Sequence, residues 1–324
     1  MATKRKIYIP CNLATAAGAT TLVDLPLYYD YHSIGFEYVD NGAAGAAFTA
    51  PHIVYSTTGN LYTGGVSAGG ILGDIALKVN ADVKRIHSAQ ELDRLNGING
   101  TLFQCEQIVT GTVAGGVITP ATGSVKQVLK LHFAEPWRTD KNDRLACVAT
   151  MAPAFGVNSA QLQITLGQAL PATGTLLIYA VVDTPTATVP KTGPLVKLVQ
   201  RSDIVVAGSA FDYTALNQNG YYQTVLMKQP TGGGYIAKAT LKVNGTVLRE
   251  IDREANIAEL LYNTMNPSTS IVAGAFGFDM VLDDDDPLSS ALPAAGNNFV
   301  LHLDFAGTAS GSMRAMIETV QFGW

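Results

Sequence analysis

A run of four aspartates, Asp283 to Asp286, is the densest group of metal-binding side chains in this 324-residue chain. Successive side chains of an extended strand point to opposite faces, so Asp283 and Asp285 could share one divalent cation. The run lacks the glycine and the distal glutamate that an EF-hand loop requires. We expect a solvated loop at the end of a strand and no metal site. A divalent ion held by Asp283 and Asp285 at a contact between subunits is the alternative.

Histidine, cysteine and glycine patterns predict no further chemistry. No two histidines have the His-x-His or His-x-x-x-His spacing of metal ligands. The three cysteines, Cys11, Cys105 and Cys147, have neither metal-ligand spacing nor the even number of a disulfide framework. The glycine runs at 63–70 and 231–235 lack the residues of a phosphate-binding motif, and we expect both to be loops. We therefore expect no catalytic residue, no cofactor and no enzymatic activity.

Charge is sparse in this sequence. Charged residues make up 15% of the chain, against about 25% in an average soluble domain. Such a surface is typical of a protein that is largely covered by other protein molecules, although a β-rich protein with many glycine turns has the same composition. The net charge of −5 argues against a protein whose main task is to grip nucleic acid.

The N-terminus begins with the basic residues Lys4, Arg5 and Lys6 but has no apolar stretch long enough for a secretory signal. No segment approaches the ~20 apolar residues of a membrane span. We expect synthesis and folding in a cytosol. Three basic residues before the first β-like stretch are usually a solvated tail. The alternative is that they meet anionic lipid headgroups or an adjacent subunit.

Short apolar stretches, separated by Gly, Pro, Asn and Asp at intervals of about ten residues, predict an all-β protein. Two helices are also expected. In the segment 88–97, Ser88 and Glu91 can form a capping box, and in the segment 252–267 Asp252 can cap the first turn. The expected strands are 32–39, 74–80, 125–133, 161–166, 175–183, 221–228, 235–244, 276–283, 298–305 and 313–322.

One short sequence occurs twice. Residues 76–88, ALKVNADVKRIHS, align without gaps with residues 240–252, TLKVNGTVLREID, and share the tetrapeptide Leu-Lys-Val-Asn. An expected helix follows each copy, and the later strands come in the same order in both halves. This duplication predicts two copies of one β unit, in which Leu77–Asn80 superposes on Leu241–Asn244.

We therefore expect two tandem jelly rolls, each a β-sandwich with one short helix in a long connection. The first covers residues 1–183 and the second residues 195–324. The segment 184–194 is a proline-rich linker. The main difference in length between the halves is the glycine-rich segment 110–124, which is expected to be a loop on the shared scaffold.

These features resemble a known family, the double jelly-roll major capsid proteins of tailless icosahedral viruses, and especially those of small membrane-containing bacteriophages. The likeness covers nearly the whole chain, and the duplicated order of its short motifs is its most specific part. In the first half it rests on GATTLVDLP at 18–26, LKVNADVKRIHSAQELDRLNG at 77–97 and LHFAEPW at 131–137. In the second half it rests on ATLKVNGTVLREID, FDMVLDDDDP and the closing LHLDFAGTASGSMRAMIETVQFGW.

The resemblance implies a homotrimer whose six jelly rolls form a pseudo-hexagonal capsomer. Such capsomers would build an icosahedral shell with neighbouring capsomers and penton or minor capsid proteins, above an internal lipid membrane. It implies a virion protein that is made in the host cytoplasm and binds no specific nucleic-acid sequence. Lys4, Arg5 and Lys6 would then contact the membrane or a neighbouring capsomer. The alternative function is a jelly-roll spike that binds a glycan or a receptor.

Overall fold

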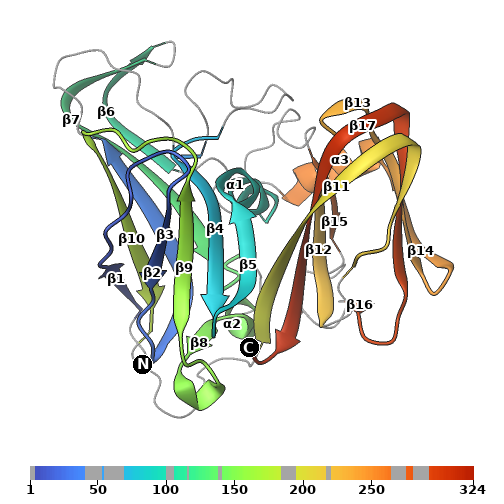
Figure 1. Cartoon of the computed structure of the whole chain (residues 1–324), viewed down its shortest axis with the longest axis horizontal. Helices are drawn as coiled ribbons and strands as arrows, with labels where there is room; N and C mark the ends of the chain where they lie inside the picture. The colour runs from blue at the N-terminus through green and yellow to red at the C-terminus, as the bar shows by residue number, and fades with distance from the viewer. Residues whose placement is uncertain are drawn as a thin grey trace.

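The computed structural model describes residues 4–40, 53–54, 69–99, 106–114, 117–137, 141–183, 195–216, 220–263, 275–279 and 292–324. Within them the chain folds into two β-sandwiches that stand side by side, with helix α1 (Ala89–Ile98) between them (Figure 1). The prediction of an all-β chain with two tandem jelly rolls is confirmed.

The first jelly roll is a sandwich of two antiparallel sheets. Its strands are β1 (Arg5–Ile9), β2 (Thr20–Asp24), β3 (Tyr29–Asp40), β4 (Leu72–Val79), β5 (Asp82–Ser88), β6 (Glu106–Ala114), β7 (Val117–His132), β8 (Ala149–Met151), β9 (Ala160–Leu166) and β10 (Gly174–Val182). One sheet has the order β1–β10–β3–β7–β6, with β8 beside β3, and the other has the order β2–β9–β4–β5. This alternation between sheets is jelly-roll connectivity. Apolar side chains such as Phe36, Leu77 and Ile178 fill the space between the sheets.

The second jelly roll uses two long strands where the first uses four short ones. Its strands are β11 (Leu195–Tyr213), β12 (Tyr221–Lys228), β13 (Gly232–Val243), β14 (Thr246–Asp252), β15 (Ala275–Asp279), β16 (Leu292–Pro293) and β17 (Phe299–Phe322). The end of β17 lies between β12 and the beginning of β11, whereas its beginning lies between β13 and the end of β11. Both long strands thus run from one sheet into the other. Val225, Leu241 and Ile317 belong to the apolar core of this second jelly roll.

The duplicated sequence forms the same hairpin in both jelly rolls, β4–β5 in the first and β13–β14 in the second. The register shifts at the same place, after Leu77 and after Leu241. Each turn has two successive residues with positive φ, 52° and 70° at Asn80–Ala81 and 50° and 81° at Asn244–Gly245. Two positive φ values are typical of the type I′ turn of two-residue hairpins, which asparagine and glycine tolerate best.

The side chain of each turn asparagine ties its hairpin to the neighbouring strand. Oδ1 of Asn80 accepts hydrogen bonds from the backbone N–H groups of Asn158 (2.8 Å) and Ser159 (3.2 Å), which precede β9. Oδ1 of Asn244 accepts one from the N–H of Asn298 (2.8 Å), which precedes β17. The equivalence predicted for the two tetrapeptides is therefore confirmed in strand, register and turn.

Each hairpin leads into a capped helix, as predicted. The N–H of Ser88 donates to Oε2 of Glu91 (2.8 Å), and the N–H of Glu91 donates to Oγ of Ser88 (3.2 Å), which completes the capping box of α1. At the start of α3 (Arg253–Asn263), Oδ1 of Asp252 accepts a hydrogen bond from the N–H of Ala255 (2.8 Å). Local sequence therefore determines where both helices begin.

Two segments that were predicted to be loops belong to strands. The described residues of 110–124 lie in the hairpin of β6 and β7, so the insertion extends a sheet. The glycine run at 231–235 opens β13. A Cβ atom on Gly233 would lie 2.0 Å from the carbonyl oxygen of Thr308, so the strands can approach each other there only because the residue is glycine.

Other differences concern the number of elements. The strands expected at 298–305 and 313–322 are one strand, β17, which passes Gly307 with a positive φ. The sequence pattern did not indicate the long strand β11. It also did not indicate helix α2 (Lys141–Ala146) or the 3₁₀ turn η1 (Pro153–Phe155).

The two jelly rolls meet along β5 and β11. These strands run parallel with Val199 opposite Arg85, so the sheet β2–β9–β4–β5 continues into the second jelly roll. The predicted linker at 184–194 lies outside the described residues. The boundaries 1–183 and 195–324 therefore stay a prediction.

We expect the turn asparagines to contribute measurably to stability. Asn80→Gly removes the side-chain hydrogen bonds, whereas Asn80→Ala also puts alanine at a φ of 52°. A hydrogen bond contributes about 1 kcal/mol and a left-handed alanine costs about 1–2 kcal/mol. We expect losses in the free energy of unfolding of about 2 kcal/mol for glycine and about 3 kcal/mol for alanine. Urea denaturation measures both, and the same pair of variants at Asn244 should give the same order. Equal losses for glycine and alanine at both positions would contradict a role of the turn conformation.

Candidate functional site

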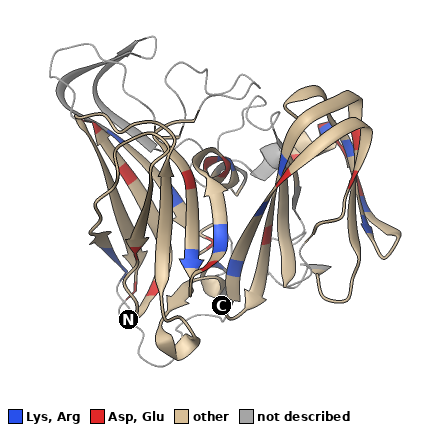
Figure 2. Ribbon diagram, in the orientation of Figure 1, with Lys and Arg blue, Asp and Glu red and all other residues tan. Residues whose placement is uncertain are grey.

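Elements of both jelly rolls form the junction: β5 and α1 from the first, and β11, β12 and β17 from the second. Leu95, Val199, Leu226 and Met316 pack together there, and Ile257 of α3 packs against them. Figure 2 shows blue and red segments on these elements, on a ribbon that is otherwise mostly tan. The junction therefore has a small apolar core and a concentration of charged side chains in a chain that carries few.

An ammonium group is buried in this junction. Lys197 on β11 pairs with Glu135, which follows β7, and its Nζ lies 3.3 Å from Oε1 of Glu318 on β17. The three side chains are between 1% and 4% exposed. Burial acts to lower the pKa of Lys197, but the two carboxylates outweigh it and the pKa is raised. The ammonium therefore stays charged and joins the two jelly rolls at a point that water does not reach.

Two further basic side chains, both on β5, are buried beside this group. Arg85 donates from Nη1 to the carbonyl oxygen of His132 (2.6 Å), and its guanidinium lies 5.2 Å from the ring centre of Phe133. His87 is fully buried, with its Nδ1 3.3 Å from Sδ of Met316. Burial, together with the positive charge of Arg85, lowers the pKa of His87 well below its usual value. His87 is therefore neutral at pH 7.

Ion pairs at the junction also connect the two jelly rolls. Arg201 on β11 donates two hydrogen bonds, of 2.7 and 2.9 Å, to the carboxylate of Asp74 on β4. Arg314 on β17 pairs with Glu91 of α1 (3.1 Å) and with Asp203 of β11 (2.6 Å). A guanidinium that binds both oxygens of a carboxylate restricts orientation as well as distance. These pairs therefore help to fix how one jelly roll sits on the other.

The duplicated hairpin has different surroundings in its two copies. Arg85 and Arg249 occupy the same position, opposite Leu77 and Leu241 respectively. Arg85 is buried because β11 lies beside β5, whereas Arg249 is half-buried and pairs with Glu259 of α3. In the described structure β14 lies at the edge of its sheet. The same strand is therefore an internal contact in the first jelly roll and an edge in the second.

The sequence does not reveal the buried ion pairs of Lys197 at the junction. One signal was present in β11, where Lys197 alternates with Leu195 and Val199 and so shares a face with two buried apolar side chains. A lysine on an apolar face needs a buried partner. The sequence gives no indication that Glu135 and Glu318 are that partner.

The candidate metal ligands taken from the sequence are not among the described residues. In the described part of the chain, no three His, Cys, Asp or Glu side chains gather as metal ligands would. Asp283 and Asp285 lie outside the described residues. The sequence contains one Gly-x-Ser-x-Gly order, at 65–69, which is the order of the nucleophile elbow of some hydrolases; the expectation of no catalytic residue overlooked it. All of this segment except Gly69 lies outside the described residues.

The three basic residues at the N-terminus are exposed, and two of them have partners within the chain. Arg5 and Lys6 lie in β1, so the expectation of a solvated tail does not hold for them. Arg5 donates to the hydroxyl of Tyr29 (3.0 Å), and Lys6 pairs with Glu37 (2.9 Å). Lys4 makes no hydrogen bond or ion pair with a described residue. Their contact with a membrane or with a neighbouring chain stays a prediction.

The fold is similar to solved structures of viral proteins. The major capsid protein P2 of bacteriophage PM2 matches with a TM-score of 0.66 at 12% identity, over 99% of this chain and 98% of its own. The PBCV-1 virus capsid matches with a TM-score of 0.63 at 11% identity, over 99% and 94%. The Sulfolobus turreted icosahedral virus structure matches with a TM-score of 0.63 at 13% identity, over 98% and 91%. No family model and no curated protein sequence matches this chain.

At identities of 11% to 13% this likeness establishes the fold alone. Nearly the whole of each chain is covered, so both jelly rolls and their order are shared with the viral proteins. The chain therefore has the double jelly-roll fold that the resemblance implied.

Lys197→Met should destabilise the junction because it leaves two buried carboxylates without their cation. Removing one partner of a buried ion pair costs about 3–5 kcal/mol. The double variant, in which only Glu135→Gln is added, should regain most of that loss, because Glu318 then remains as the counter-charge of the buried Arg85. Urea denaturation measures it through the fluorescence of Trp137, whose ring centre lies 5.5 Å from Nζ of Lys197. A double variant that is less stable than Lys197→Met would show that uncompensated charge is not the cause.

Acid should weaken the junction through His87. The unfolded chain binds a proton there near pH 6.5, whereas the folded chain binds it only at a much lower pH. Between these values the unfolded state holds more protons, so stability decreases by up to about 1.4 kcal/mol for each unit by which the pH is lowered. His87→Ile, which copies Ile251 at the equivalent position of β14, should remove this part of the slope. Urea midpoints at pH 6 and pH 5 measure it, and identical slopes for the two proteins would rule the mechanism out.

Proposed function

We propose that the protein is the major structural unit of an icosahedral viral shell and has no enzymatic activity. The observation that carries this proposal is the double jelly-roll fold, which a bacteriophage major capsid protein and other viral proteins share over nearly their full length. The low charged fraction of 15% supports it, because a shell protein covers much of its surface with its neighbours. The same comparisons favour a shell protein over the alternative, a glycan- or receptor-binding spike.

The contact inside one chain indicates how copies could associate. β5 of the first jelly roll lies beside β11 of the second. By their places in the two jelly rolls, β14 corresponds to β5, and β1 corresponds to the beginning of β11. Both β14 and β1 lie at the edges of their sheets in the described structure. We infer that β14 of one chain packs beside β1 of the next. Such a head-to-tail contact can close into a ring, and a ring of three chains places six similar jelly rolls around one axis.

The two edges carry apolar side chains that are exposed in the single chain. Val247 and Leu248 on β14 are each 52% exposed, and Tyr8 on β1 is 55% exposed. Removing apolar surface of this kind from water drives association. On β5, which has its neighbour within the chain, Arg85 and His87 are buried. A chain-to-chain contact at β14 would bury its edge in the same way.

The remaining partners follow from the same proposal. Trimers would contact neighbouring capsomers and penton or minor capsid proteins in a virion, after synthesis in the host cytoplasm, without sequence-specific binding of nucleic acid.

Both termini lie at one end of the molecule (Figure 1). There Lys4, Arg5 and Lys6 could meet an adjacent chain or an internal membrane, where each cation near anionic lipid contributes about 1 kcal/mol. None of the described helices is long and apolar enough to cross a membrane. Asp283 and Asp285 remain candidate ligands for a divalent ion between subunits.

The ring contact is tested by a charge on the β14 edge. Leu248→Glu should convert trimers to monomers, because an unpaired carboxylate would be buried at the contact at a cost of several kcal/mol. Val205→Glu is the matched control: Val205 is also an exposed apolar residue of a strand, at 80% exposed, but lies on neither proposed edge. Analytical ultracentrifugation at micromolar concentration measures the trimer fraction of both variants.

The outcomes separate the levels of this proposal. A wild-type protein that stays monomeric and never forms trimers or shells contradicts the shell function. A wild-type trimer that survives Leu248→Glu contradicts the β14 contact only.

Replacing Lys4, Arg5 and Lys6 together by Ala separates the two roles of the N-terminus. Loss of the trimer assigns them to the neighbouring chain, whereas loss of binding to anionic vesicles with an intact trimer assigns them to the membrane. No change in either measurement refutes both roles.

A further inference from the structure

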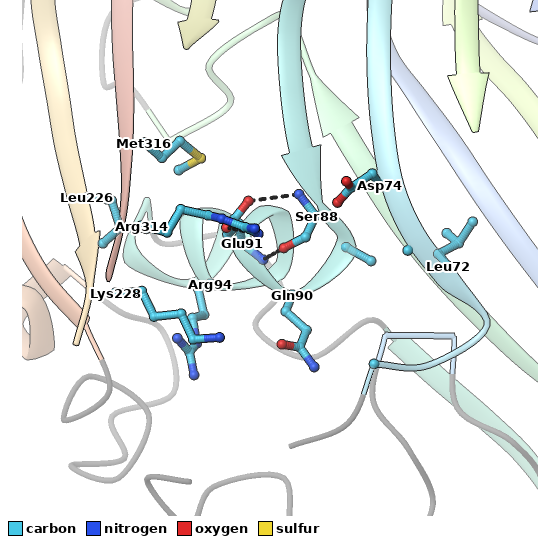
Figure 3. A pocket seen from close by; sticks show the side chains of 13 residues that line it. Leu72, Asp74, Ser88, Gln90, Glu91, Arg94, Leu226, Lys228, Arg314 and Met316 are labelled. Atoms are coloured by element: carbon cyan, nitrogen blue, oxygen red, sulfur yellow. Dashed lines mark hydrogen bonds and ion pairs between the residues drawn. The ribbon is translucent and has the colours of Figure 1, made fainter. Parts of the chain in front are cut away.

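A pocket opens between the two jelly rolls beside α1 (Figure 3), with a volume of about 150 Å³. Gln90, Glu91 and Arg94 of α1 line it from the first jelly roll. Lys228 of β12 and Arg314 of β17 line it from the second. Since both jelly rolls supply its walls, the pocket exists only while they are docked.

The carboxylates around this pocket already have cationic partners. Asp74 accepts two hydrogen bonds from Arg201. Glu91 accepts a hydrogen bond from Arg314 through Oε1 and uses Oε2 to complete the capping box of α1. Asp203 also accepts hydrogen bonds from Arg314. These acidic groups are therefore engaged with the two arginines of the second jelly roll.

Arg94 and Lys228 are the two cationic side chains of the pocket that form no hydrogen bond or ion pair with a described residue. Figure 3 shows both side chains at the same side of the pocket, one from α1 and one from β12. Burial lowers the pKa of Lys228, the positive charges of Arg94 and Arg314 lower it further, and the carboxylates of Glu91 and Asp203 offset this only in part. The two cations are therefore close enough to repel each other.

We propose that Arg94 and Lys228 bind an oxyanion of the phosphate class in this pocket. The guanidinium of Arg94 offers paired donors that match two phosphate oxygens, and Lys228 adds a point charge from the opposite jelly roll. The N-terminus of α1 is not the anion site, because Ser88 and Glu91 cap it. A bound oxyanion removes the repulsion between the two cations and links α1 to β12. It thereby holds the two jelly rolls together.

Thermal unfolding in inorganic phosphate, compared with chloride at equal ionic strength and pH 7, tests the site. A ligand that binds only the folded chain should raise the melting temperature by about 2 °C or more at ten times its dissociation constant. Phosphate also stabilises proteins in general, because it is excluded from their surfaces. The comparison between variants therefore decides the result.

Arg94→Gln and Lys228→Gln should each lose the phosphate-specific rise. In chloride they should be at least as stable as the wild type, because the repulsion is gone. Lys242→Gln is the matched control, since it removes one positive charge at the β13–β14 hairpin, away from the pocket. Isothermal titration calorimetry with inorganic phosphate should show saturable binding in the wild type and in Lys242→Gln, and none in Arg94→Gln.

Two results overturn the proposal. One is an equal response to phosphate in the wild type and all three variants, which would be the general effect of the salt. The other is a wild type without a specific response that gains one when the four aspartates at 283–286 are replaced by Asn. In that case the chain's own carboxylates, and not a separate oxyanion, would hold the two cations.

Discussion

The arrangement of the two jelly rolls depends on the neutralisation of Lys197 inside their junction. An ammonium ion that leaves water without a partner costs several kcal/mol, and this one is 3% exposed. Glu135 comes from the first jelly roll, whereas Glu318 comes from the second together with Lys197. The closer of the two pairs, Lys197 with Glu135, therefore forms only when the jelly rolls dock in one position. A buried ion pair adds little net stability over apolar packing; its effect is to penalise every other way of docking.

The two jelly rolls share a plan, but their neighbours decide what each shared residue does. Arg85 is buried and donates to a backbone carbonyl, while Arg249 at the same position reaches Glu259 at the surface. At the next inward position the second jelly roll has Ile251 where the first has His87. The turns and helix caps are kept in both copies because they depend on local geometry alone. The residues that face the junction have diverged because only one copy has a neighbour within the chain.

The sequence could predict the duplicated plan of two jelly rolls and the features that a few consecutive residues decide, but not the contacts between residues far apart in the chain. The turn at Asn80 and its copy are local, and both were predicted as equivalent. The strand β17 was divided wrongly because Gly307 lies at an irregularity: its φ is positive and the register with β11 and with β13 shifts there, but pairing continues on both sides of it. The buried charge was out of reach, since Lys197 and Glu135 are 62 residues apart and belong to different jelly rolls. The alternation of residues along a strand predicts on which face of the sheet a side chain lies, but it does not predict which residue of another element lies opposite that side chain.

The sparse charge of the chain has a physical cause on the proposed ring. In such a ring, two sides of each jelly roll would be covered by neighbouring jelly rolls. A charged side chain on a covered side is removed from water, which costs free energy unless it is paired with an opposite charge. At the internal contact Arg201 pairs with Asp74 across the junction. At the β14 edge, Glu250 already pairs with Lys238 of the neighbouring strand β13, and the apolar side chain of Leu248 on β14 is exposed. A chain that repeats this contact around a ring therefore needs few charges, and it places them where a partner of opposite sign is already fixed.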